Sequence, residues 1–557
     1  MKKFNLGFYA AAIVSGLVGV VACSSSTPDN NNPIDPRQCT TDQDCVNLGG
    51  EFRGRTCSTE GVCVVKESPI AADATDTGCV DNAGCAAKNG GRASICPTPG
   101  QKCVDIANDQ CEVIGTWEDP NKIVFGAVVP SLSTDSSFAF FGEDSRRNFT
   151  MAAEELAGAT IGGRRPVTVI CKANSAPKKD DTLGVVKHLL STVDVDVFYA
   201  QMPEDMLSAA RQFRDGARKR PAVCTHCLHP LRDSIKGISD ETDFFQRLQT
   251  SVDSAPLFQD TIARFEQRRI DSGNTTPIKV ALIGWEYVDF SPLADKIVST
   301  LKFNGKTVAE NKTDGRYAYL SSPANVTSAW IAQLETLRAM SPDVVILVGA
   351  DEMTRGTIPY IESMGIAPKY ILYSAVANGA FPSVVGGNNP LLARMNTISA
   401  PFVYPDADFT RFVGFLGRFG SRFPQVSATE NPGFWVYESM YMGAWAAAAA
   451  GPLTGKLTSA QFAQGLTATN DETGTSIALG PATITQMGAA SGGTKFKLLG
   501  VLSTTGMNAT KGMPAGALGA SFCLVNAGGM VIPSQSGRVL LTGLGVAVGE
   551  DACPLPL

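Results

Sequence analysis

The sequence is poor in the residues and motifs on which the common enzyme classes depend. Only 3 histidines occur among its 557 residues. Neither a Gly-x-Ser-x-Gly turn, which exposes the nucleophile of many hydrolases, nor a Gly-rich phosphate loop is present. A hydrolase or a nucleoside triphosphatase would therefore need a site of unfamiliar pattern. We expect a protein that is not an enzyme and holds no cofactor.

Strong charge of one sign and long apolar runs are also missing. A net charge of −6 is mild for 557 residues and gives no electrostatic reason to expect a nucleic acid partner. Beyond the N-terminal segment, the run that comes closest to a membrane span, residues 443–451, falls well short of the ~20 residues needed. With 44% hydrophobic and 18% charged residues, the chain can bury more than one core, which predicts about two or three domains.

An apolar run near the N-terminus ends at a cysteine. Lys2 and Lys3 precede the apolar residues 8–22, which matches the charged start and short apolar stretch of a secretory signal. The sequence Val-Val-Ala-Cys ending at Cys23 resembles a bacterial lipobox. That resemblance implies removal of residues 1–22 and a lipid on Cys23, with a membrane as partner. Each buried methylene would contribute about 0.8 kcal/mol to membrane binding.

The residues after Cys23 concern the destination of the protein. In lipoproteins a serine at this position usually accompanies transfer to the outer membrane, so Ser24 favours the outer over the inner membrane. Residues 23–38 are rich in Ser, Asn, Asp and Pro and predict a flexible tether. An ordinary signal peptide with an incidental cysteine, or an uncleaved N-terminal anchor, is the alternative.

Eight further cysteines form a tandem repeat within residues 39–105. Spacings of five, eleven and five intervening residues recur as five, ten and six, and both copies end in Cys-Val. Each module has few large apolar side chains, so disulfides must stabilise it. A zinc site is the weaker alternative, because the modules lack histidine and close Cys-x-x-Cys pairs. The disulfide candidates are Cys39, Cys45, Cys57 and Cys63 in the first module and Cys79, Cys85, Cys96 and Cys103 in the second.

Six cysteines follow the modules, two of them in the phrase Cys224-Thr-His-Cys-Leu-His229. Two cysteines and two histidines so close together are compatible with zinc or with a redox pair. An oxidising compartment favours structural disulfides instead, and we expect no metal. The candidates are Cys111, Cys171, Cys224 and Cys227, with Cys523 and Cys553 closing the C-terminal region.

From residue 122 onward, β-branched runs alternate with segments of helical periodicity, the pattern of parallel strands joined by crossover helices. The pattern predicts strands at 123–129, 166–171, 195–200 and 222–224, with helices at 147–156, 183–190 and 204–217. It then restarts, with strands at 278–284, 306–311, 343–349 and 370–374 and helices at 255–268, 292–303, 327–340 and 354–365. Two doubly wound α/β lobes are therefore expected, and ligands bind such sheets at the carboxyl ends of their strands.

Residues 121–515 resemble the type I periplasmic binding proteins, especially the leucine/isoleucine/valine-binding group of ABC-transporter receptors. The likeness rests on the order of elements and on the phrases at 123–131, 278–284, 341–349 and 435–445. It implies a two-lobed, Rossmann-like domain over residues 119–557. Lobe 1 would comprise about 121–250 and 378–455, and lobe 2 about 251–377 and 456–557. The family also implies a disulfide from Cys171 to Cys224 or Cys227.

The same resemblance implies a set of ligand-binding residues. Amino-acid receptors of this family hold a ligand carboxylate with hydroxyls and helix starts and the ammonium with acidic and aromatic groups. Packing is the alternative role for Phe141, and helix capping is the alternative for Asp351. Gln201 stands where a Ser-Ser pair is usual, which counts against an α-amino-acid ligand. The candidates are Ser131, Ser133, Phe141, Thr225, His226, Tyr287, Asp351 and Glu352.

These observations predict a lipid-anchored receptor that closes two lobes on a small polar ligand, either amino-acid-like or a small organic acid. An ABC permease is the candidate partner if the anchor lies on the inner membrane. An outer-membrane position favours a surface sensor. The alternative is an interaction protein that binds through its cysteine-rich modules and keeps the two lobes as a scaffold.

Overall fold

The computed structural model describes residues 41, 43, 55–57, 63–65, 78–133, 136–174, 182–248, 250–322, 328–349, 352–373, 389–399, 406–426 and 433–501, and then 507–508, 513–514, 520–527, 530–533, 539–542 and 545–548. Outside this part lie Cys23, Cys39, Cys45, Asp351 and Cys553, and also the side chains of Cys57, Cys63, Glu352 and Cys523. The chain divides into two units, Met1–Ala72 and Asp73–Leu557. In the first unit, strands β1 (Arg55–Cys57) and β2 (Cys63–Val65) pair antiparallel.

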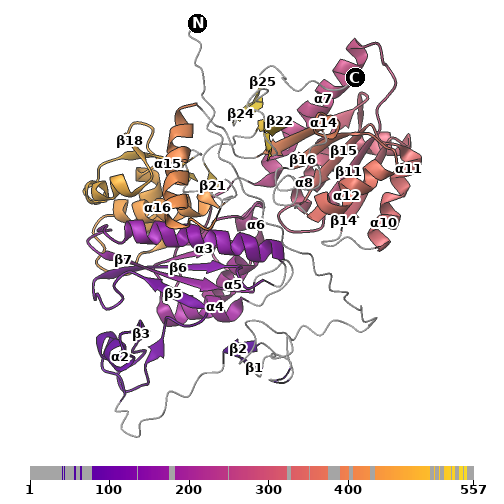
Figure 1. Ribbon diagram of the computed structural model, residues 1–557. Helices are drawn as coiled ribbons and strands as arrows, with labels where there is room; N and C mark the ends of the chain where they lie inside the picture. The colour runs from indigo at the N-terminus through magenta and orange to yellow at the C-terminus, as the bar shows by residue number, and fades with distance from the viewer. Residues whose placement is uncertain are drawn as a thin grey trace. The chain divides into compact units, whose positions relative to one another are not determined.

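A six-stranded sheet organises the first lobe (Figure 1). Its order is β10-β9-β8-β6-β7-β5, and all neighbours are parallel except β5 at the edge. The strands are β5 (Cys111–Ile114), β6 (Lys122–Val129), β7 (Arg165–Lys172), β8 (Val197–Ala200), β9 (Ala222–Cys224) and β10 (Phe244–Gln246). Strands β6 to β9 confirm the four strands predicted for this lobe.

Alternate residues of β6 face two different cores, as the two-residue period of a strand requires. Phe125 belongs to one buried cluster and Val124 to the other. Helix α3 (Ser136–Leu156), which begins well before the predicted residue 147, lies along β6 and β7 on the first face (Figure 1). The second cluster includes residues of α4 (Leu183–Lys187), its π-helical continuation η2 (His188–Val193), α5 (Pro203–Arg214) and α6 (Leu231–Ile235).

A seven-stranded sheet of order β14-β11-β15-β16-β17-β22-β23 organises the second lobe. Its first five strands are parallel, and β22 and β23 add antiparallel. The strands are β11 (Val280–Trp285), β14 (Tyr317–Ser322), β15 (Val344–Val348), β16 (Lys369–Tyr373), β17 (Met395–Ser399), β22 (Ala520–Ala527) and β23 (Met530–Pro533). The helices of this lobe are α7 (Ala255–Asp271), α8 (Ser291–Thr300), α10 (Ser328–Leu334), α11 (Thr336–Met340) and α12 (Glu352–Ser363).

The strand predicted at 306–311 is wrong. A short hairpin of β12 (Lys302–Phe303) and β13 (Lys306–Thr307) turns at Asn304 and Gly305, both of which have positive φ. Helix α9 (Val308–Thr313) follows at once, because Thr307 and Glu310 form a capping box. The strand that joins the sheet is β14, which the sequence interpretation missed.

The predicted lobe boundaries also need correction. Strand β17 lies in the second sheet, although residues from 378 were assigned to lobe 1. Residues just after 455 were assigned to lobe 2, yet Lys456 pairs with Asp194 at 3.5 Å, and Leu457 N donates to Asp196 at 3.4 Å. The chain therefore returns to lobe 1 with α15 (Asp406–Arg422), α16 (Phe434–Ala449), α17 (Ser459–Ala468), α18 (Met487–Ser491) and the parallel pair β18 (Thr475–Ala478) and β19 (Phe496–Leu499). It rejoins lobe 2 at β22.

Helix α16 is apolar on every side and is buried along nearly its whole length, as such helices are. It packs against α3, α17 and α18. The contact with α17 is very close: a Cβ atom placed on Gly465 would lie 1.9 Å from the carbonyl oxygen of Ala446.

Further short elements are η3 (Glu241–Asp243), η4 (Ser251–Ser254), α14 (Asn389–Leu392), η7 (Pro481–Gln486), the pair β20 (Met507–Asn508) and β21 (Met513–Pro514), and the pair β24 (Val539–Thr542) and β25 (Gly545–Val548).

Asp144, on α3, is a carboxyl group that is 1% exposed and lies against the start of α16. Burial raises its pKa to about 7, although Arg147 and Gly433 act in the opposite direction. The folded protein therefore keeps a proton that the unfolded chain releases near pH 4, so this contribution to stability is full below pH 4 and is lost as the pH rises through about 7. We predict that Asp144→Asn gains about 2–4 kcal/mol of stability relative to wild type between pH 4 and pH 8. Urea titrations of both proteins across this range test it, and parallel pH profiles would contradict it.

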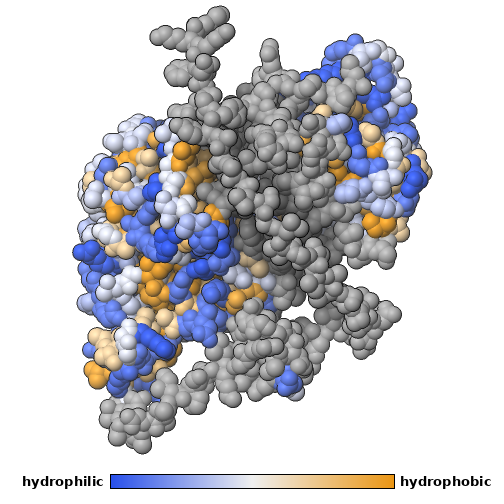
Figure 2. Space-filling model, viewed as in Figure 1, coloured by the Kyte–Doolittle hydropathy of each residue, from blue (hydrophilic) through white to orange (hydrophobic). Residues whose placement is uncertain are grey.

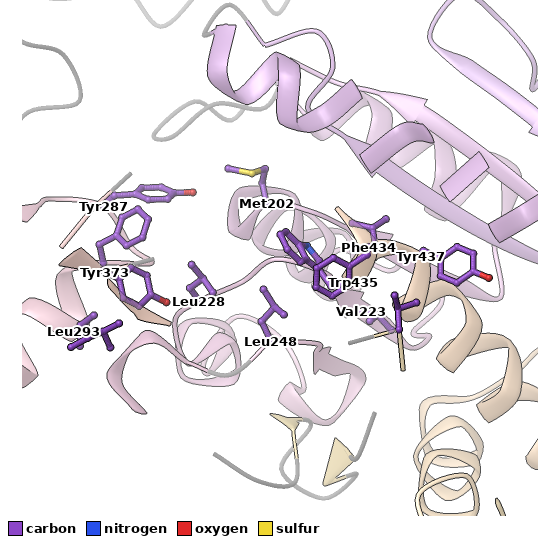
Figure 3. Close-up of a cluster of buried hydrophobic side chains, with 14 of the residues drawn as sticks. Met202, Val223, Leu228, Leu248, Tyr287, Leu293, Tyr373, Phe434, Trp435 and Tyr437 are labelled. Atoms are coloured by element: carbon purple, nitrogen blue, oxygen red, sulfur yellow. The ribbon is translucent and has the colours of Figure 1, made fainter. Parts of the chain in front are cut away.

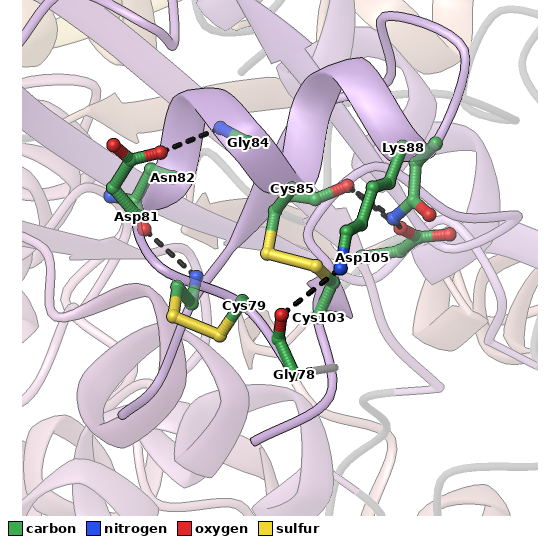
Figure 4. The surroundings of a disulfide bond; sticks show 12 residues. Gly78, Cys79, Asp81, Asn82, Gly84, Cys85, Lys88, Cys103 and Asp105 are labelled. Carbon is green, nitrogen blue, oxygen red and sulfur yellow. Dashed lines mark hydrogen bonds between the residues drawn. A yellow bond between two sulfur atoms is a disulfide. The ribbon is translucent and has the colours of Figure 1, made fainter. Parts of the chain in front are cut away.

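The second cysteine-rich module consists of α2 (Asn82–Lys88), β3 (Ser94–Ile95) and β4 (Val104–Asp105). Its disulfides join Cys79 to Cys96 and Cys85 to Cys103, as Figure 4 shows in part. Asp81 caps α2 by accepting a hydrogen bond from Gly84 N at 2.7 Å. The predicted disulfide-stapled module is confirmed.

This module is built into the first lobe. The indole N–H of Trp117 donates to Ser94 O at 2.9 Å. Ile95 and Ile106 belong to the same buried cluster as Val124 of β6. The module therefore shares a buried apolar core with the first lobe.

The hairpins of the two modules share one register. Arg55 lies opposite Val65 in β1 and β2, as Ser94 lies opposite Asp105 in β3 and β4. These are equivalent positions of the sequence repeat. Arg55 and Ser94 each lie two residues before the third cysteine of their module, and Val65 and Asp105 each lie two residues after the fourth.

Equal register predicts equal connectivity, so we expect the first module to link Cys39 to Cys57 and Cys45 to Cys63. Peptide mapping of the unreduced protein should recover these two linked pairs. A link between Cys57 and Cys63, which face each other in the hairpin, would contradict the prediction.

The remaining described disulfides are Cys111–Cys171 and Cys224–Cys227. The expected link from Cys171 to Cys224 or Cys227 is wrong, because β6 and β8 separate β7 from β9. Cys111 on the edge strand lies directly opposite Cys171, with 4.1 Å between their Cα atoms. The disulfide at 224–227 leaves no thiolate there for zinc.

Polar and apolar residues are interspersed over the described part of the face shown in Figure 2. The large apolar side chains that are exposed come from separate elements. Within the described residues, no helix combines the length and apolarity that crossing a bilayer requires.

Candidate functional site

Three loops meet at the carboxyl edge of the first sheet. Ser131 follows β6, Gln201 follows β8, and Thr225 and His226 follow β9. Because β9, β8 and β6 are neighbours in the sheet, these loops lie side by side. Thr225 N donates to Ala200 O at 2.8 Å, which fixes the β8 and β9 loops against each other.

An aromatic cluster stands beside these loops. The ring of His226 stacks on Trp435 with 5.3 Å between centroids and meets the edge of Phe141 at 4.6 Å. Phe141 is held close to the β6 loop, since a Cβ atom on the adjacent Gly142 would lie 2.4 Å from the backbone of Ser131. Trp435 comes from the first turn of α16 and was not predicted as a site residue, although the phrase at 435–445 had marked this helix.

His226 is uncharged at neutral pH. Burial lowers its pKa to about 4, against the opposing effect of Asp289. Its Nδ1 atom is shielded from solvent and has no hydrogen-bond partner among the described residues. The ring can therefore offer a hydrogen bond to a ligand without offering a positive charge.

The other predicted residues of the first lobe divide into two kinds. The hydroxyl of Ser131 is shielded and has no partner among the described residues. The hydroxyl of Thr225 donates to Ala200 O at 3.4 Å and is thus engaged within the protein. Ser133 is nearly buried and also has interactions within the protein. Ser131, Phe141 and His226 are the predicted residues that the fold brings together.

Gln201 is the residue of these loops that stands out. Its side chain is fully buried, and neither carboxamide atom has a partner among the described residues. An unsatisfied buried polar group costs about 1–3 kcal/mol. The sequence had marked Gln201 as a departure from the family pattern but had not named it as a site residue.

The loop after β11 contributes from the second lobe. The hydroxyl of Tyr287 donates to Glu204 at 3.0 Å, which joins this loop to the start of α5. Burial, together with the nearby carboxylates of Asp289 and Asp205, raises the pKa of Glu204 to about 7. Asp351 and the side chain of Glu352, predicted for the same lobe, lie outside the described residues. Figure 3 shows Met202, Leu228, Leu248 and Trp435 of the first lobe in one buried cluster with Tyr287, Leu293 and Tyr373 of the second.

Asp289 joins the two lobes. Its Oδ1 accepts hydrogen bonds from Leu228 N at 2.9 Å, His229 N at 3.1 Å and lies 2.8 Å from His229 Nδ1. Its backbone oxygen accepts from Ser251 Oγ at 2.7 Å. One residue of the β11 loop thus holds both the 228–229 segment and Ser251. The chain passes from the first sheet to the second lobe near these two places.

A buried ion pair lies at the base of the first-lobe loops. Arg247, which follows β10, pairs with Glu438 of α16, and both side chains are 3% exposed or less. The backbone N–H of Arg247 also donates to Cys224 O at 2.9 Å. This pair fixes α16, and with it Trp435, relative to β9 and β10.

A cavity of about 250 Å³ lies elsewhere, near the amino ends of β15, β16 and β17. Two of its charged groups are engaged in ion pairs, Asp343 with Arg269 and Arg394 with Glu362, each at 2.5 Å. It lies away from the carboxyl-end loops and is not the candidate site. Its lining comprises Phe265, Ser341, Pro342, Asp343, Gly365, Ile366, Ala367, Lys369 and Arg394.

Two α/β lobes, with polar and aromatic side chains on the loops at the carboxyl ends of their strands, define a two-lobed ligand-binding protein. Residues 123–494 match the family model described as periplasmic binding protein, and the chain belongs to that family. The fold is that of the type I periplasmic binding proteins, as the sequence predicted.

Solved structures with this fold include LivJ, the branched-chain amino acid transporter substrate-binding protein of Streptococcus pneumoniae, in complex with isoleucine. It is 13% identical and covers 76% of this chain and 99% of its own, with a TM-score of 0.51. A solute-binding protein of an ABC transporter from Rhodopseudomonas palustris HaA2, in complex with p-hydroxybenzoic acid, is 10% identical and covers 76% of this chain and 97% of its own, with a TM-score of 0.50. At such identities the likeness concerns the fold alone. A search of curated protein sequences found no match.

Proposed function

We propose that the protein is an extracytoplasmic receptor that closes its two lobes on a small polar ligand, either amino-acid-like or a small organic acid. The observation that carries the proposal is the group of shielded polar atoms on Ser131, Gln201 and His226 that have no hydrogen-bond partner in the described part of the chain, beside an aromatic cluster. Such groups are stabilised when a ligand supplies their hydrogen bonds. The ligands named for the similar structures, isoleucine and p-hydroxybenzoic acid, are consistent with this class.

Closure would use the connections already described. Tyr287 and Asp289 hold the β11 loop of the second lobe against Glu204 and the 228–229 segment of the first. A ligand that contacts loops of both lobes would bind the closed arrangement more tightly than the open one, and would therefore shift the protein toward the closed arrangement. An ABC permease is the proposed partner if the protein is anchored at the inner membrane.

The test is ligand-dependent thermal stabilisation of the full-length protein against a panel of amino acids, organic acids and their amides. A true ligand at 100 times its Kd should add about 2.7 kcal/mol to the free energy of unfolding. A protein whose melting temperature none of these compounds raises would not be a receptor of this kind.

We further propose that Cys23 carries the lipid anchor and that Ser24 directs the protein to the outer membrane. The lipobox-like sequence supports this, and the outer-membrane position would favour a sensor over a transport receptor. Labelled palmitate should enter the wild-type protein and not Cys23→Ala, which should leave the membrane fraction. An unlabelled wild type, or a Cys23→Ala protein that stays on the membrane, would overturn it.

A further inference from the structure

We infer that the ligand presents an uncharged hydrogen-bonding head, a carboxamide or ureido group on a planar body, to Gln201 and His226. The inference rests on the proposed function, because it concerns the ligand of the same loops. It narrows the ligand class, since it excludes a free carboxylate at this position.

Gln201 requires both a donor and an acceptor. Its buried carboxamide offers one N–H₂ group and one oxygen. A ligand carboxamide satisfies both atoms at once. A carboxylate accepts from the N–H₂ group but places its charge against the oxygen and leaves that oxygen unsatisfied.

His226 and Ser131 have the same dual character. A neutral imidazole has one donor and one acceptor nitrogen, and a hydroxyl can do either. The rings of Trp435 and Phe141 flank His226, which favours a planar group between or beside them. All three polar groups are uncharged, so a desolvated carboxylate would gain no opposite charge from them.

The charges around these loops also disfavour an anion. Glu204, Asp205 and Asp289 lie close enough together for both aspartates to raise the pKa of Glu204. Asp289 also acts on His226. Arg247, the buried arginine of this region, is already paired with Glu438. A ligand with a neutral head avoids repulsion by the acidic groups and needs no cation.

Matched pairs of carboxamides and carboxylates test the inference on the full-length protein: benzamide with benzoate, 4-hydroxybenzamide with 4-hydroxybenzoate, and nicotinamide with nicotinate. We expect at least one carboxamide to bind, and to bind roughly tenfold or more tightly than its carboxylate. A carboxylate that binds as tightly as its amide would overturn the inference and leave the proposed function intact, and so would binding confined to amino acids or acids of the wider panel. Silence across both panels would overturn the inference and the proposed function together.

A pair of variants separates ligand binding from folding. Gln201→Met removes a carboxamide with no partner among the described residues, so the melting temperature should hold or rise, and the preference for the amide should fall roughly tenfold or more. Gln246→Met is the matched control, because that buried carboxamide accepts from Leu231 N at 3.2 Å and donates to Cys227 O at 2.8 Å. The control should melt at a lower temperature and keep the preference. A Gln201→Met protein that melts lower, or that keeps the preference, would overturn the inference.

Discussion

Replacing Arg247 by methionine is expected to destabilise the protein by about 3–5 kcal/mol, because it removes the ion-pair partner of the buried Glu438 carboxylate. Neither side chain of the pair is more than 3% exposed. The free energy of unfolding, measured by urea titration at pH 7, tests this.

The double variant Arg247→Met, Glu438→Leu is the control for this prediction. Replacing both partners by apolar groups of similar volume is often neutral or stabilising, so most of the lost stability should return. A single variant as stable as wild type would show that the pair is not desolvated. A double variant as unstable as the single one would show that packing, and not charge, is what Arg247 supplies.

Asp289→Ala is expected to cost about 2–4 kcal/mol of stability and to weaken ligand binding. The substitution removes the acceptor for two buried backbone N–H groups, at Leu228 and His229, together with the side-chain contact to His229. The loss of stability follows because the two backbone N–H groups are left without an acceptor in the interior. The weakening of ligand binding follows because the same residue connects the β11 loop to the first lobe.

Asp289→Asn separates these contributions. Asparagine keeps an oxygen that can accept from the two backbone groups and loses only the charge, so we expect less than half of the stability loss. Urea titration and ligand titration of both variants provide the measurement. An alanine variant with wild-type stability would mean that Asp289 does not hold the lobes together.

The parallel strands could be predicted because burial on both faces leaves a plain mark in the sequence. Strands β6, β11 and β15 are nearly continuous runs of buried apolar residues, which neither a surface helix nor a loop produces. Strand β17, with sequence Met-Asn-Thr-Ile-Ser, has no such run, and it was assigned to the wrong lobe. The β12–β13 hairpin shows the opposite error, because a β-like stretch at 306–311 was predicted to be a strand of the sheet. The turn at 304–305 and the capping box at Thr307 and Glu310 instead produce a short hairpin and a helix.

The site could be predicted in position but only partly in composition. The end of a strand marks where a loop begins, and the family resemblance proposed Ser131 and His226 in two of these loops. Which side chains are left without partners depends on packing between elements distant in the sequence. Gln201 and the contact of Trp435 with His226 are of that kind. The pairing of Cys111 with Cys171 likewise required the sheet order, since nothing in the spacing of 60 residues distinguishes it.

The position of the Cys111–Cys171 bond sets how mechanical tension would travel through the first lobe. A pull on the chain before residue 78 crosses the second module partly through its own disulfides and reaches Cys111 at the start of β5. There a covalent bond transfers the load to β7, an interior strand. Without that bond, the load would peel the edge strand away one hydrogen bond at a time.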